Sequence, residues 1–64
     1  MTGPAEPTEA DIEREFPAWE VYWSFSLPRA RLRDDPAVTV RGEDLLDLRD
    51  EMVRAEARRM WGGG

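Results

Sequence analysis

The stretch Trp19-Glu20-Val21-Tyr22-Trp23-Ser24-Phe25-Ser26 decides the fold of this chain. Large apolar side chains occupy every second position in it, and most of them are aromatic or β-branched. A period of two in such residues is typical of a β-strand that buries one of its faces. We therefore predict a strand over residues 19–26 whose buried face carries Trp19, Val21, Trp23 and Phe25.

Two shorter strands are expected after it. Pro28 occupies the second position of residues 27–30, where type I and type II turns favour proline, so we predict a turn there. Residues 29–33 alternate again, and the pair Asp35-Pro36 predicts another turn before a third strand at residues 37–41. Connections this short join antiparallel neighbours, which predicts a three-stranded meander.

A helix is expected on each side of the meander. Thr8 is a favourable N-cap and Asp11 follows three residues later, a variant of the capping box, so a short helix should begin here and end before Pro17. After Gly42, residues 43–61 carry apolar side chains at helical spacing. The central stripe is Leu45, Leu48, Met52 and Ala55, and it is widened by Leu46, Val53, Ala57 and Met60.

These elements predict an α+β fold with a short N-terminal helix, a three-stranded antiparallel β-meander and a C-terminal helix packed on one sheet face. Residues 8–61 would form one small domain between a flexible tail at 1–7 and a flexible glycine tail at 62–64. The expected core joins the strand residues Trp19, Val21, Trp23, Phe25, Leu32, Val38 and Val40 to the helix residues Leu45, Leu48 and Met52.

The composition argues against most catalytic chemistry. The chain has 64 residues with no Cys, no His and no Lys, so all nine basic residues are arginines. Ser24 and Ser26 therefore have neither an imidazole nor an amine to activate them as nucleophiles. The carboxylates lack the alternating spacing and the glycine turn of a calcium loop. We expect no enzymatic activity, no cofactor and no metal site.

The charge balance and the N-terminus indicate where such a protein would act. The net charge is −5, which disfavours nucleic acid as a partner. The first residues lack the basic start and apolar core of a secretory signal, and no apolar run reaches the ~20 residues that span a bilayer. We expect a cytoplasmic protein without membrane association. The exclusive use of arginine and the absence of Lys and Asn indicate a high-GC bacterial source.

One surface is a candidate binding face. Arginine and tyrosine are enriched at protein interfaces, where they combine contact area with directional hydrogen bonds. On the sheet face away from the helix we expect Tyr22, Arg29, Arg31, Arg33 and Arg41, with Glu20 neutralising one arginine across the strands. Trp61, beyond the helical stripe, is a further candidate for a partner contact. The small core leaves open a weak homodimer or a monomer of low stability.

The string Phe16-Pro17-Ala18-Trp19-Glu20-Val21, followed by Tyr22 and Trp23, resembles a group of small, uncharacterised actinobacterial proteins with a Phe-Pro-x-Trp-x-Val-Trp motif. Residues 38–40 and 48–52 are similar to that group's valine-rich strand and closing helix. Such proteins are often encoded beside helix-turn-helix regulators. The resemblance implies an accessory role and supplies no catalytic residue.

The function expected from these observations is a non-enzymatic protein-interaction module, an accessory of a transcription regulator if the resemblance holds. Two alternatives stay open. The first is an acidic inhibitor, an antitoxin or a nucleic-acid mimic, that binds a basic protein through the acidic face of the C-terminal helix. The second is a ribosomally made precursor peptide whose glycine tail is the substrate.

Overall fold

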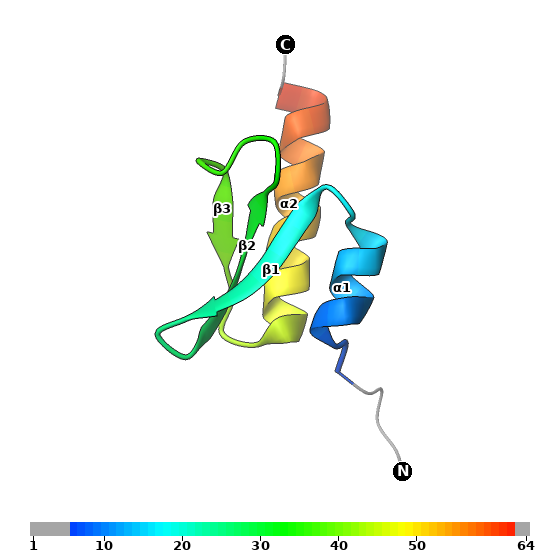
Figure 1. Cartoon of the computed structure of the whole chain (residues 1–64). Helices are drawn as coiled ribbons and strands as arrows, with labels where there is room; N and C mark the ends of the chain where they lie inside the picture. The colour runs from blue at the N-terminus through cyan, green and yellow to red at the C-terminus, as the bar shows by residue number, and fades with distance from the viewer. Residues whose placement is uncertain (1–5, 63–64) are drawn as a thin grey trace.

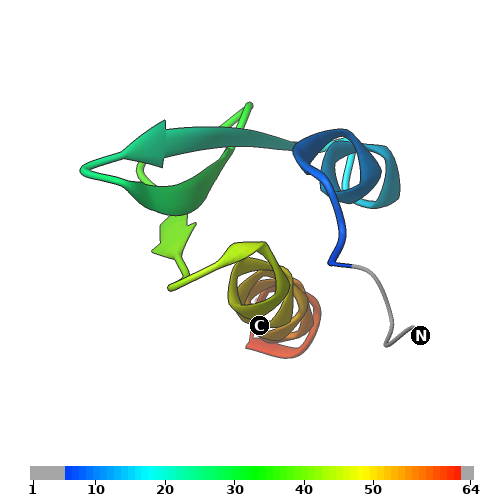
Figure 2. The ribbon, with the colours of Figure 1, turned by 90° about the horizontal axis from the view of Figure 1, so that it is seen from below.

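Two helices and a small sheet make up the described part of the chain (Figure 1). The computed structural model describes the backbone of residues 6–62 and the side chains of residues 6–60. The elements are α1 (Glu9–Glu15), β1 (Trp19–Ser24), β2 (Leu27–Leu32), β3 (Thr39–Arg41) and α2 (Leu45–Gly62). The strands are antiparallel in the order β1-β2-β3, α2 lies across one face of the sheet, and α1 lies beside β1 (Figure 2). The predicted α+β fold and its meander are confirmed.

The tails lie largely beyond the described part. The predicted flexible tail at 1–7 overlaps it only at residues 6 and 7, which form neither helix nor strand. At the other end α2 includes Gly62, which we had assigned to the glycine tail. Residues 1–5 and 63–64 lie outside the described residues.

The core is a single cluster between the sheet and the helices. Its buried members are Ile12, Trp19, Val21, Ala30, Leu32, Leu48, Met52 and Ala55. Phe16, Val38, Val40 and Leu45 pack against it while partly buried. The central stripe of α2 and the beginning of β1 therefore meet as predicted. Ile12 adds α1 to the same cluster, so the short helix is held by burial and not by helix propensity alone.

Each helix begins at a side-chain cap. The Thr8 hydroxyl accepts from the backbone N–H of Asp11, and the Asp11 carboxylate accepts from the backbone N–H of Thr8, both at 3.1 Å. This reciprocal pair completes the predicted capping box and lowers the pKa of Asp11. At the start of α2 the Asp44 carboxylate accepts from the backbone N–H of Asp47 at 2.8 Å. Because Gly42 is buried where an added Cβ would overlap the Leu48 backbone, the chain can pass from β3 into α2 at close range.

The two helices are also joined by an ion pair. The Arg49 guanidinium of α2 donates to both carboxylate oxygens of Glu15 in α1, at 2.7 Å and 2.5 Å. These hydrogen bonds hold the pKa of Glu15 below its ordinary value. A carboxyl group whose folded-state pKa is lowered stabilises the fold above its unfolded-state pKa. That contribution is lost as the pH falls through the lower, folded-state value.

A buried tryptophan connects β1 to α2. Trp19 is fully buried, and its indole Nε1 donates to the Glu56 carboxylate at 2.6 Å. A buried indole N–H needs an acceptor because no water can take its place. Glu56 lies 37 residues further along the chain, so this bond places α2 on the sheet at one position along the helix.

We predict that Glu56→Ala lowers the free energy of unfolding by about 1–3 kcal/mol, since the Trp19 N–H would stay buried without its acceptor. The matched control is Glu51→Ala. Both glutamates pair with the arginine three residues later, but Glu51 accepts from no indole. Its loss should cost no more than about 1 kcal/mol, as for exposed ion pairs.

Urea unfolding of both variants measures the difference. Glu56→Gln, which keeps an acceptor oxygen, should recover most of the loss. Equal destabilisation by Glu56→Ala and Glu51→Ala would show that the indole bond contributes nothing.

The hairpin differs from the prediction. The turn consists of Phe25 and Ser26, both with positive φ (53° and 65°), and β2 already begins at Leu27. A two-residue hairpin requires positive φ there, which Asn and Gly adopt readily, and neither residue type is present to indicate the turn. Pro28 is tolerated in β2 because its missing N–H would face away from β1, at the end of the β2–β3 ladder, where its carbonyl accepts from Gly42 N–H at 3.1 Å.

Two predicted core residues are therefore wrong. Phe25 is 90% exposed at the hairpin tip, and Trp23 is 49% exposed with its indole N–H donating to Glu9 of α1. The hairpin tip projects sideways, away from both helices, so it finds no second layer to pack against (Figures 1 and 2). The predicted widening of the α2 stripe is wrong as well, because its members Leu46, Val53, Ala57 and Met60 are exposed.

We predict that the double change Phe25→Asn, Ser26→Gly raises the free energy of unfolding by about 1 kcal/mol or more, because positive φ is costly for Phe and Ser. The exposed Phe25 ring contributes little burial that could be lost. Thermal and urea unfolding give the result. An unchanged or lowered midpoint would contradict the proposed backbone strain.

Candidate functional site

Four of the predicted site residues share the sheet face that points away from the core. The strand register places Arg29 between Tyr22 of β1 and Arg41 of β3. It places Arg31 between Glu20 of β1 and Thr39 of β3. This arrangement follows from the period of two, which the sequence already displayed.

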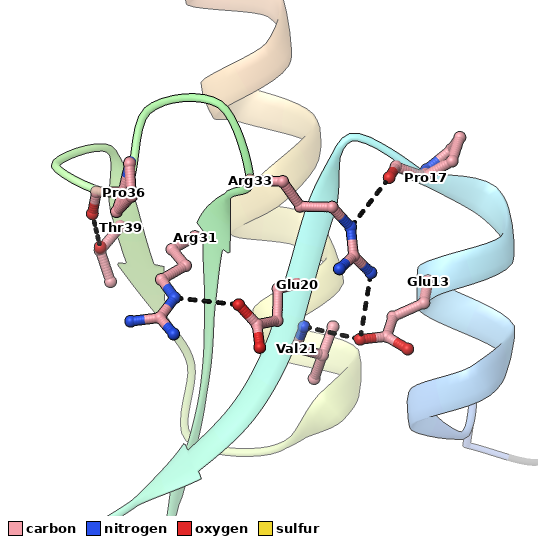
Figure 3. A network of polar contacts seen from close by, with 8 residues as sticks. All are labelled: Glu13, Pro17, Glu20, Val21, Arg31, Arg33, Pro36 and Thr39. Atoms are coloured by element: carbon pink, nitrogen blue, oxygen red, sulfur yellow. Dashed lines mark hydrogen bonds and ion pairs between the residues drawn. The ribbon is translucent and has the colours of Figure 1, made fainter.

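Arg31 is compensated within this face. Its Nε donates to the Glu20 carboxylate at 3.1 Å (Figure 3), and its guanidinium carbon lies 4.9 Å from the centre of the Tyr22 ring. The predicted cross-strand neutralisation by Glu20 is thus present. Both side chains of the ion pair are over 40% exposed, so the pair adds little stability. Tyr22 and Arg31 form a preorganised stacked pair at the surface.

Arg33 is engaged near α1 and not with the other four. It lies just beyond the end of β2, and its Nε donates to the Pro17 carbonyl at 3.3 Å while its guanidinium approaches Glu13 at 3.9 Å (Figure 3). The same Glu13 oxygen accepts from the backbone N–H of Val21 at 2.9 Å. Arg33 therefore belongs to the corner that fastens α1 to β1. Its backbone N–H donates to the Ala18 carbonyl at 2.9 Å, so the pairing beside β1 continues one residue past β2.

Trp61, the remaining predicted contact, lies near the C-terminal end of α2. Its side chain is outside the described residues, so the structure assigns it no neighbours.

The charges of the nine arginines are not equally compensated. Six form ion pairs with carboxylates: Arg14, Arg31, Arg33, Arg49, Arg54 and Arg59. Arg29, Arg41 and Arg58 form none among the described residues. All three line one open hollow of about 620 Å³, together with Thr39, Val40 and Glu51. We call this site the arginine hollow.

Two features of the arginine hollow favour an anionic group there. Arg29 and Arg41 are direct cross-strand partners, and like charges placed opposite each other repel. The Arg29 Nε is shielded from solvent and has no hydrogen-bond partner among the described residues. The carboxylate in the hollow, Glu51, is engaged by Arg54 at 2.9 Å. An anionic group from outside would relieve both the repulsion and the missing hydrogen bond.

The sequence reasoning missed one member of this site. This member is Arg58, whose distance in sequence from β3 gives no reason to join the two. The helical spacing of Arg58 and Glu51, seven residues apart, does indicate that they share a helix face. Only the packing of α2 against the sheet brings that face to β3.

Other site types find no support in the described residues. No three acidic side chains there are grouped so that they could hold a metal ion. No helix within residues 6–62 combines the length and the apolar composition needed to cross a membrane. In comparisons with known proteins, no family model, no curated protein and no solved structure matches the chain.

We predict that Glu13→Ala lowers the free energy of unfolding by about 1–2 kcal/mol, because the Val21 N–H loses its acceptor and Arg33 its carboxylate. Arg41→Ala, which breaks no ion pair among the described residues, should change stability by less than about 0.5 kcal/mol. The urea unfolding midpoints of the two variants test whether Glu13 stabilises the fold while the Arg41 charge does not. Equal losses would contradict it.

Proposed function

We propose that the protein is a non-enzymatic interaction module that binds an acidic segment of a partner protein in the arginine hollow. The observation that carries this proposal is the concentration of Arg29, Arg41 and Arg58 in one hollow. The three arginine charges repel one another, so their placement together disfavours the folded state. In a chain with net charge −5, such a cluster gives a local attraction for an acidic segment.

A protein partner fits better than a nucleic acid. The negative charge of the chain as a whole repels a polyanion many charges long, whereas a short acidic segment meets only the local positive field. The stacked pair of Tyr22 and Arg31 beside the site supplies the residue types enriched at protein interfaces. An accessory role beside a transcription regulator, which the actinobacterial resemblance implies, is compatible with such a module.

The alternative of an acidic inhibitor has weaker support. Three acidic side chains of α2 are engaged within the chain: Glu56 by Trp19, Glu51 by Arg54, and Asp47 by the backbone N–H of Glu43. An inhibitor would need these carboxylates to face a basic target. The precursor-peptide alternative concerns the glycine tail, most of which lies outside the described residues.

We predict that the protein binds a fluorescently labelled hexaglutamate peptide and that Arg41→Glu weakens this binding by at least about tenfold. The matched control is Arg14→Glu, which makes the same charge change on α1, where Arg14 pairs with Asp11. It should weaken binding by less than about threefold, since its effect acts only at long range.

Fluorescence anisotropy at moderate salt measures both affinities, with single-stranded DNA of equal charge as a competitor. Equal weakening by both variants would show that only net charge matters. Tighter binding of the DNA than of the peptide would indicate that the partner is a nucleic acid and not a protein.

A further inference from the structure

The two edges of the sheet have different surroundings. At the β1 edge, α1 lies alongside the strand (Figures 1 and 2). The Glu13 carboxylate accepts a hydrogen bond from the outward backbone N–H of Val21. At the β3 edge no further strand pairs among the described residues, and α2 contacts β3 from the core side. An open edge can pair with another chain, so natural sheets usually cover or blunt it.

The backbone of β3 has hydrogen-bonding groups to offer at that edge. Val38 C=O and Gly42 N–H bond to β2, at 3.1 Å each. Backbone groups in an antiparallel strand alternate in direction, so Val40 also faces β2 while Thr39 and Arg41 face outward. Thr39 and Arg41 take part in no turn or loop backbone hydrogen bond of the described residues.

The surroundings of the edge favour an extended segment with two kinds of side chain. A second hollow of about 340 Å³ adjoins the arginine hollow and shares Thr39, Val40 and Arg58 with it. This second hollow contains the apolar residues Val38 and Ala55. An added strand alternates its side chains between two faces, so apolar residues would lie beside Val38 and Val40, which pack on the core, and acidic residues beside Arg41.

We propose that β3 accepts an extended peptide of alternating acidic and apolar residues as a fourth strand of the sheet. This proposal rests on the proposed function and adds the conformation and the sequence pattern of the bound segment. The occupant is acidic because the three uncompensated arginines line the same edge. A second copy of this chain is disfavoured there, since joining two β3 edges would bring both sets of arginines together.

The probe is a labelled hexapeptide of alternating glutamate and valine. Its control is the same peptide N-methylated at every backbone amide, which keeps every charge and side chain but has no N–H to donate along either edge. We expect the methylated peptide to bind at least about tenfold more weakly. On saturation with the unmodified peptide, the amide hydrogens of Thr39 and Arg41 should exchange at least about tenfold more slowly.

The outcomes separate the two proposals. Equal binding of the two peptides, with unchanged exchange at Thr39 and Arg41, overturns strand addition while the acidic-partner function stands. Binding of neither this peptide nor hexaglutamate overturns both. Self-association at the β3 edge, seen as slowed exchange of the same two amides with rising protein concentration, would overturn the proposal in favour of a second copy.

Discussion

The burial of Trp19 is the constraint on which the rest of the structure depends. A fully buried indole brings both a large apolar surface and an N–H that must find an acceptor. Glu56 supplies the acceptor at 2.6 Å, and this bond joins the first residue of β1 to a position well along α2. The apolar stripe of α2 must then cover the sheet at that point. Ile12 lies in the same core cluster, so the place of α1 depends on it too.

The distribution of charge follows from this arrangement. Several carboxylates serve internal contacts: Glu13 fastens α1 to β1, Glu15 joins the two helices through Arg49, and Glu20 neutralises Arg31. Each of them also pairs with an arginine, and three further arginines pair with carboxylates on their own helix, which leaves three of the nine unpaired among the described residues. These three gather at β3 because α2 crosses the sheet there. An acidic chain thereby carries a local positive site next to an uncovered strand edge.

Part of the candidate site could be predicted because strand periodicity is local. Tyr22, Arg29, Arg31 and Arg41 share a face as expected, since alternation requires only neighbouring residues. Arg33 is engaged apart from these residues, because the Pro17 carbonyl and the Glu13 carboxylate lie within reach of its guanidinium. Arg58 was missed because it meets β3 only through the packing of α2. Phe25 was placed in the core because the turn contains neither Asn nor Gly, the residue types that usually indicate positive φ.

The sequence by itself determined the order of elements, the antiparallel meander, the central stripe of α2 and the capping box of α1. These depend on interactions between residues a few positions apart, which periodicity and capping patterns report. The tertiary structure alone decided which arginines stay uncompensated, which sheet edge is covered and where the hairpin leaves the core. These depend on contacts between distant residues, such as Trp19 with Glu56, whose geometry no local pattern contains.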